Sequence, residues 1–137
     1  MTENPTLLCV VAAALVRPDG KVLLAQRPAG KNHGGLWEFP GGKVDPGETL
    51  ESALVRELAE ELAIVVSPEN LAPATFAADG RTAIFLFACR TWEGEARCVE
   101  AQGLEWHAPA AVKRLPMPPL DYPLARRLGE LLCREAI

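Results

Sequence analysis

The amino-acid sequence predicts an α/β/α sandwich built on a mixed β-sheet within a single domain. Short β-rich runs alternate with two helical segments, at about 50–63 and 123–135, and this order favours a sheet with helices on both faces. The length of 137 residues fits one domain over residues 1–137. Hydrophobic residues make up 49% of the chain and charged residues 23%, which excludes a disordered chain.

The N-terminal part of the chain predicts two strands and a glycine-rich loop. Apolar runs at about 7–16 and 21–27 flank a turn signal at 17–20, so we expect strand, turn and strand. Residues 28–35 predict a loop, and residues 36–39 predict a short extended segment.

The segment at about 50–63 predicts a helix that follows a turn at 45–48. Thr49 stands just before it and is a favoured N-cap residue. Apolar residues at helical spacing form one stripe, which we expect to face the core: Leu54, Val55, Leu58, Ala59 and Leu62.

The C-terminal half predicts further strands and two more helices. Strands are expected at 64–66, 74–77, 82–92 and 104–107, and residues 92–95 predict a hairpin turn into a strand at 96–99. A short helix is expected from Pro109 to near Leu115, and a final helix at 123–135. The apolar side of the final helix consists of Leu124, Leu128, Leu131 and Leu132.

The charge balance restricts the partners that the protein can have. Fourteen basic and eighteen acidic residues give a net charge of −4, which argues against nucleic acid or a membrane surface as partner. The apolar run at 7–16 is too short to span a bilayer, and no basic residue precedes it as in a signal peptide.

The four cysteines indicate the compartment. Cys9, Cys89, Cys98 and Cys133 form no C-x-x-C pair, so no zinc site or redox motif is indicated. Two disulfides are possible on count alone, but free thiols in a reducing compartment are favoured, and we expect a cytoplasmic protein.

Three carboxylates on the 50–63 helix are the strongest chemical signal. Glu57, Glu60 and Glu61 are spaced i, i+3 and i+4, so they share one stripe beside the apolar face. They repel one another near the helix C-terminus, where the helix dipole disfavours anions. A solvated acidic surface is one interpretation. The other is a site for Mg²⁺ or Mn²⁺, since oxygen-only ligands favour these ions over zinc.

The residues upstream of the helix favour the metal site. The backbone at Gly41 and Gly42 can approach closely because neither residue has a side chain, so carbonyls can ligate metal and N–H groups can face phosphate. Glu48 adds a further carboxylate between this turn and the helix.

This pattern resembles the Nudix box. Gly42, five residues, Glu48, seven residues and then Arg56-Glu57-Leu58-Ala59-Glu60-Glu61-Leu62-Ala63-Ile64 match it over residues 42–64. Residues 36–43 are similar to the stretch that leads into the box in MutT-like members. The resemblance implies a single Nudix-like domain. Ala63 departs from it, because the family has glycine there, and alanine in a left-handed helix end costs on the order of 1 kcal/mol.

The resemblance also implies a reaction. Nudix enzymes hydrolyse a nucleoside diphosphate linked to another group, and they convert a nucleoside triphosphate into a monophosphate and pyrophosphate. By resemblance, Glu57, Glu60 and Glu61 hold Mg²⁺, for which Mn²⁺ can substitute, together with the Gly41 carbonyl.

Three further roles follow from the same resemblance. Glu57 is the first choice for the general base among the box glutamates. Arg56 is expected to orient the carboxylates by ion pairing. Glu100 falls where MutT-like proteins carry an additional metal ligand, although an ordinary loop acid is the alternative.

Substrate specificity depends on residues outside the box. Arg27 matches an arginine near the nucleotide in MutT-like proteins, and Asp121 stands where the bacterial MutT pattern has a base-reading asparagine. An ionised aspartate only accepts hydrogen bonds, whereas a buried, protonated aspartate also donates one. Asp121 could instead, or in addition, be the N-cap of the last helix.

The remaining candidate contacts with the substrate are Phe39, Gly42, Lys43 and Arg81. The sequence slightly favours 8-oxo-dGTP as substrate. CTP or an oxidised pyrimidine nucleotide is the alternative, because Ala25-Gln26-Arg27-Pro28 and Asp121 also resemble the CTP pyrophosphohydrolase branch. A non-catalytic, nucleotide-sensing domain is the third interpretation. The expected partner is a small nucleoside triphosphate, bound by a monomer or homodimer.

Overall fold

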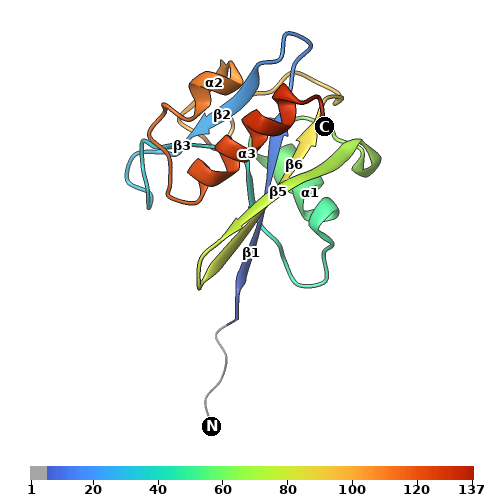
Figure 1. Ribbon diagram of the computed structural model, residues 1–137. Helices are drawn as coiled ribbons and strands as arrows, with labels where there is room; N and C mark the ends of the chain where they lie inside the picture. The colour runs from blue at the N-terminus through green and yellow to red at the C-terminus, as the bar shows by residue number, and fades with distance from the viewer. Residues whose placement is uncertain (1–5) are drawn as a thin grey trace.

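A four-stranded mixed sheet forms the centre of the fold, with strand order β4-β1-β6-β5 (Figure 1). The computed structural model describes residues 6–137. β1 (Leu8–Leu15) runs parallel to β6 (Thr82–Cys89), whereas β4 (Gly41–Lys43) and β5 (Leu71–Ala78) are antiparallel to their neighbours.

A smaller antiparallel sheet extends from the first one. Its order is β3 (Trp37–Glu38), β2 (Val22–Gln26) and β7 (Gly103–His107). A bridge between Val16 and Val22 connects the end of β1 to β2 across the predicted turn. Since β3 and β4 are nearly consecutive in sequence, the chain passes from the small sheet to the large one at Phe39 and Pro40, just before Gly41 and Gly42 of β4.

Helices cover both faces of the four-stranded sheet, as the alternation of side chains along β1 requires. Val11, Ala13 and Leu15 pack with α1 (Leu50–Leu62), whereas the intervening alanines of β1 pack with α3 (Asp121–Cys133). The predicted α/β/α sandwich with a mixed sheet is therefore confirmed. The remaining helices are short: α2 (Pro109–Val112) and the 3₁₀ turn η1 (Pro68–Asn70).

Both ends of α1 are set by identifiable residues. The Thr49 hydroxyl accepts a 3.0 Å hydrogen bond from the Ser52 N–H, and the Ser52 hydroxyl accepts one of 3.0 Å from the Thr49 N–H. This reciprocal pair confirms Thr49 as the N-cap. At the other end, Ala63 adopts the left-handed conformation (φ 57°, ψ 35°), and its N–H bonds the Ala59 carbonyl at 3.1 Å. The helix thus ends in the glycine-type geometry although the residue is alanine.

The predicted hairpin and strand at 92–99 are wrong. The only strand-type pairing in this segment is an isolated bridge between Val65 and Glu93. The strand predicted at 64–66 is reduced to the same bridge. The 96–99 segment does not pair with a strand because its N–H groups are used elsewhere. Arg97 donates to the Leu62 carbonyl at 2.8 Å and Val99 to the Glu61 carbonyl at 3.2 Å. This loop therefore satisfies the free carbonyls at the end of α1.

Smaller differences concern element boundaries and the exposure of Ala59, which was expected to face the core but is exposed. The last helix begins at Asp121 rather than at residue 123, and α2 ends at Val112 rather than near Leu115. All four cysteines are free thiols, as expected. Over residues 6–137, none of the helices combines the length and apolar character that crossing a bilayer demands.

Replacing Ala63 by glycine should stabilise the protein. The substitution relieves the left-handed strain, so we expect the free energy of unfolding to rise by about 0.5–1 kcal/mol, measured by urea denaturation. Ala59→Gly is the matched control, because Ala59 is an exposed residue inside the same helix, and this change should destabilise by about 1 kcal/mol. A loss of stability in Ala63→Gly would contradict the strain.

Candidate active site

A cavity of about 530 Å³ lies where β1, β3, β4 and the start of α3 meet α1. Its wall includes most of the residues that the sequence nominated: Arg27, Phe39, Gly41, Gly42, Lys43, Glu57, Glu61 and Asp121. Phe39 and Asp121 are buried, whereas Lys43 is exposed at the rim. The fold thus brings the box and the distant specificity candidates to one place.

The three box glutamates do not share one environment. The Glu57 side chain is 14% exposed and lies against Gly42, where an added Cβ would be 2.5 and 2.6 Å from its two oxygens. Glu61 accepts a 3.1 Å hydrogen bond from the Gly41 N–H. Glu60 is 51% exposed and contacts Arg56 Nη1 at 3.3 Å. A side chain at position 42 would displace the Glu57 carboxylate, whereas one at position 41 would clash with the backbone carbonyl of Val11, so glycine is needed at position 41.

Arg56 orients the acidic residues, as the sequence suggested. Its Nε and Nη2 each donate to Glu48 at 2.8 Å, and its Nη1 donates to Glu57 at 2.9 Å. Nη2 also donates to the Lys43 carbonyl at 3.1 Å. The two hydrogen bonds that Arg56 donates to Glu48 are the main reason why the pKa of Glu48 is lowered to about 2. One guanidinium therefore ties α1 to the turn that precedes it.

Burial makes the ionised form of Glu61 costly. Desolvation first, and then the neighbouring charge of Glu57, raise the pKa of Glu61 to about 8, against a smaller opposing effect of the Gly41 N–H. Desolvation also raises the pKa of Glu57, although the hydrogen bond from Arg56 opposes it. The charge of Glu100 adds to both shifts, so this loop residue lies within electrostatic range of the pair. A cation between these groups would remove the cost.

The donor groups fit a hard divalent cation. Carboxylate and carbonyl oxygens are the ligands that Mg²⁺ and Mn²⁺ prefer. Over residues 6–137, no three acidic, histidine or cysteine side chains already converge as a ligand cluster. The reason is visible in their contacts, because Glu60 turns to Arg56 and Glu61 to an amide.

The opposite end of the cavity holds an ion pair and a buried acid. Arg27 Nη1 donates to both oxygens of Glu38 at 2.9 and 3.0 Å, and Arg27 Nε donates to the Asn32 carbonyl at 2.7 Å. Asp121 accepts a 3.2 Å bond from the Phe39 N–H and is 5% exposed. Its carboxylate does not bond its own helix, and Leu120 occupies the N-cap position. The N-cap interpretation of Asp121 is therefore wrong.

Burial is the first cause of the altered acidity at this end. It raises the pKa of Asp121 to about 7, while the hydrogen bond from Phe39 opposes the shift. It raises the pKa of Glu38 as well, against the hydrogen bond from Arg27. Asp121 can thus be either a donor or an acceptor near neutral pH.

The sequence did not identify Glu38, although it lines the cavity and holds Arg27. The signal would have been the strand register, because Glu38 lies opposite Ala25, two residues before Arg27. That register is a long-range property, and the Leu-Trp-Glu-Phe stretch gives no local indication of it.

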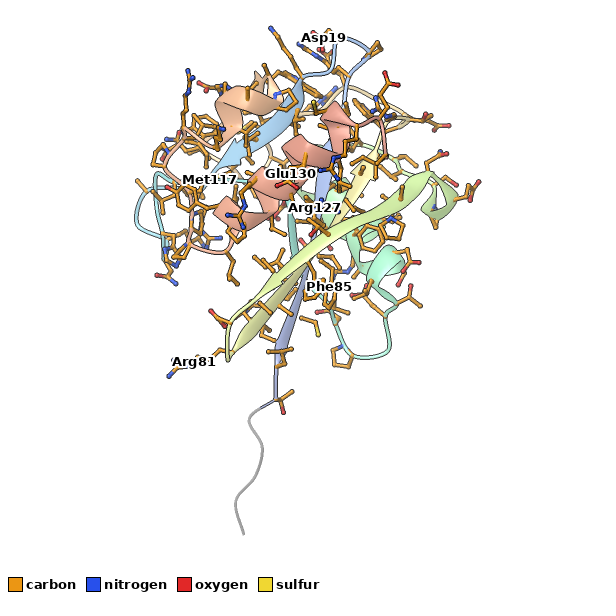
Figure 2. The ribbon with its side chains drawn as sticks, in the orientation of Figure 1. Asp19, Arg81, Phe85, Met117, Arg127 and Glu130 are labelled. Atoms are coloured by element: carbon orange, nitrogen blue, oxygen red, sulfur yellow. The ribbon has the colours of Figure 1, made fainter. Side chains whose placement is uncertain are left out.

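Four of the nominated residues do not line this cavity: Arg56 and Glu60, which contact each other on α1, and Arg81 and Glu100. Arg81 stands at the exposed tip of the β5–β6 hairpin, away from the body of the molecule (Figure 2), while its neighbours Asp79 and Thr82 line the wall. Glu100 lines a second cavity of about 530 Å³, which it shares with Arg27, Glu38 and Glu61. The two cavities therefore have three residues in common.

Sequence comparisons identify relatives of this chain among known proteins. The NUDIX domain model matches residues 6–128. A CTP pyrophosphohydrolase of Escherichia coli (strain K12) is 44% identical over 117 residues, which cover 83% of this chain and 86% of the relative. An 8-oxo-dGTP diphosphatase of Haemophilus influenzae is 38% identical over 122 residues, covering 86% of this chain and 89% of the relative.

Solved structures agree with the sequence relatives. The solution structure of the E. coli ORF135 protein superposes with a TM-score of 0.82 at 38% identity, covering 93% of this chain and 91% of that chain. A MutT structure from work on the Aliivibrio salmonicida and Vibrio cholerae proteins gives a TM-score of 0.82 at 28% identity, covering 91% of this chain and 98% of that chain.

Proposed function

This chain belongs to the Nudix family of hydrolases, and on that premise we propose that it hydrolyses a nucleoside triphosphate to the monophosphate and pyrophosphate with Mg²⁺. The observation that carries the proposal is the half-buried pair Glu57 and Glu61 against Gly41 and Gly42 of β4. Two carboxylates held together at the wall of a cavity, one with its pKa raised to about 8, need a cation to be ionised together.

The proposed metal ligands are the box glutamates Glu57, Glu60 and Glu61, the Gly41 carbonyl, and Glu100 from the facing loop. Glu57 and Glu61 have the strongest structural support, because they line the cavity and are partly desolvated. Bound Mg²⁺ would neutralise the phosphate oxygens and lower the pKa of a water molecule.

The protein groups perform the remaining tasks. Water attacks phosphorus, the P–O bond between the nucleoside monophosphate and the pyrophosphate breaks, and Glu57 accepts the proton that the water loses. Arg56 fixes the orientation of Glu57 through its 2.9 Å contact. The Gly42 backbone and Lys43, at the cavity wall, are placed to contact the phosphates. In-line positioning and charge neutralisation are what this reaction demands, without a covalent intermediate.

For the base, we place cytosine nucleotides first and 8-oxo-dGTP second. The sequence alone slightly favoured 8-oxo-dGTP. The order changes because the E. coli relative named CTP pyrophosphohydrolase is 44% identical, against 38% for the H. influenzae 8-oxo-dGTP diphosphatase. Asp121 in place of asparagine supports the same branch. A non-catalytic sensor is disfavoured, because all three box glutamates are present.

Removing one box carboxylate should strongly reduce turnover. We expect Glu57→Gln and Glu61→Gln each to lower kcat with Mg²⁺ by about 10²-fold or more, because the metal site loses charge and, at Glu57, the proton acceptor. Pyrophosphate release from CTP, dGTP, 8-oxo-dGTP and 5-hydroxy-dCTP would be measured for each variant.

The control is Glu51→Gln, in the exposed first turn of the same helix, which should retain wild-type turnover. Near-normal activity in both cavity variants would refute the proposed site. Wild-type protein that binds metal but turns over none of the four nucleotides would instead indicate a sensor.

The pH dependence of substrate binding should identify the base that Asp121 reads. A neutral Asp121 can donate to N3 of cytosine and accept from its amino group, whereas an ionised Asp121 accepts from N1–H and N2–H₂ of 8-oxoguanine. Because the folded pKa is about 7, KM for CTP should rise as pH increases through that value, and KM for 8-oxo-dGTP should fall.

Asp121→Asn is the control for this titration, since its amide does not ionise. Both KM profiles should lose their inflection near that pH in the variant. If the wild-type inflection persists in Asp121→Asn, another group titrates and the assignment to Asp121 is incorrect.

A further inference from the structure

Two loops face each other across the second cavity. The 28–35 loop joins β2 to β3 and the 90–102 loop joins β6 to β7, so both loops connect to the small sheet. The cavity between them is lined by Pro28 and Lys31 on one side and by Glu100 on the other, with Glu61 at its wall.

A pair of glutamines joins these two loops. The Ala29 N–H donates to Gln102 Oε1 at 2.9 Å, and the Gln102 N–H donates to the Gln26 carbonyl at 2.9 Å. Gln26 Nε2 in turn donates to the Gly35 carbonyl at 3.0 Å. Each side chain thus fixes one end of the 28–35 loop, and the two glutamines are bonded to each other through the backbone.

The 90–102 loop is also attached to α1. Val99 donates its N–H to the carbonyl of Glu61, at the C-terminal end of the helix. Glu100 therefore lies one residue after Val99, which is bonded to α1, and two residues before Gln102, which is bonded to the 28–35 loop. Its own side chain is exposed and forms no hydrogen bond or ion pair among those found in residues 6–137. Its placement is thus set by its neighbours in the chain.

We propose that Gln102 is a positioning residue, which holds the segment bearing Glu100 against the 28–35 loop so that Glu100 remains beside Glu61. This inference rests on the proposed function, in which Glu100 is a metal ligand. It adds that the ligand is oriented by an amide from outside the Nudix box. Gln26 supports the same contact by holding the far end of the 28–35 loop.

The physical reason is the entropy of the loop. Without the Gln102 amide, the segment keeps only the backbone hydrogen bonds of Val99 and of Gln102 itself, so Glu100 and the facing 28–35 loop can move relative to each other, and binding of metal must then order Glu100 at a cost in free energy. With the amide contact in place, the ordering is already complete when the protein folds. Loss of the Gln102 amide should therefore weaken metal affinity, whereas the global stability of the fold should change little because the side chain is exposed.

The test is Mn²⁺ binding, followed by electron paramagnetic resonance in the full-length protein with the non-hydrolysable nucleotide α,β-methylene CTP. Gln102→Met keeps the length and removes the acceptor, and it should weaken Mn²⁺ affinity by about tenfold. Gln102→Glu keeps an acceptor oxygen for the Ala29 N–H, and it should restore most of the affinity. Hydrogen exchange of the Ala29 amide should accelerate in Gln102→Met alone, which verifies the contact without any assay of turnover.

A double-mutant cycle with Glu100→Gln separates the two ideas. If Gln102 acts through Glu100, Gln102→Met should have little further effect in the Glu100→Gln background. Wild-type affinity in Gln102→Met, or an undiminished effect in the double variant, would overturn the positioning role while leaving the proposed function intact. No effect of Glu100→Gln itself would remove Glu100 from the ligand set, and the positioning role with it.

Discussion

The half-buried carboxylate of Glu61 beside Glu57 is the constraint on which the rest of this structure depends. Two acids that are held close together and withdrawn from water resist ionisation, and the raised pKa of Glu61 expresses that cost. The fold holds Glu57 and Glu61 in these positions. The Glu57 side chain occupies the space over Gly42, and α1 packs its apolar stripe against β1.

Several contacts stabilise this arrangement of neighbouring carboxylates. Arg56 pairs with Glu48 and Glu57 and so neutralises part of this charge. The left-handed Ala63 ends α1 immediately after its acidic turn, and the 90–102 loop then caps the exposed carbonyls. The acidic protein of net charge −4 thus places part of its negative charge where the proposed divalent cation would offset it.

Local patterns predicted the parts of the site that one helix determines. The spacing of Glu57 and Glu61 and the Thr49 cap follow from helical periodicity and adjacent residues, whereas the pairing role of Arg56 was implied by the resemblance to the Nudix box. The Arg27–Glu38 pair and the docking of the 90–102 loop could not be predicted in this way, because both depend on strand register and on contacts between distant segments. The hairpin predicted at 92–99 failed for the same reason, since the helix end competed for its N–H groups.

The central claim, that the half-buried carboxylates of Glu57 and Glu61 are arranged for a divalent cation, can be tested directly by a ¹³C NMR titration of the Glu61 carboxyl group. Without divalent metal, this carboxyl should titrate with a pKa near 8. With saturating Mg²⁺, it should be ionised at about pH 6, because the bound cation displaces the proton. An ordinary glutamate pKa without metal, or a raised pKa that Mg²⁺ leaves unchanged, would contradict the account.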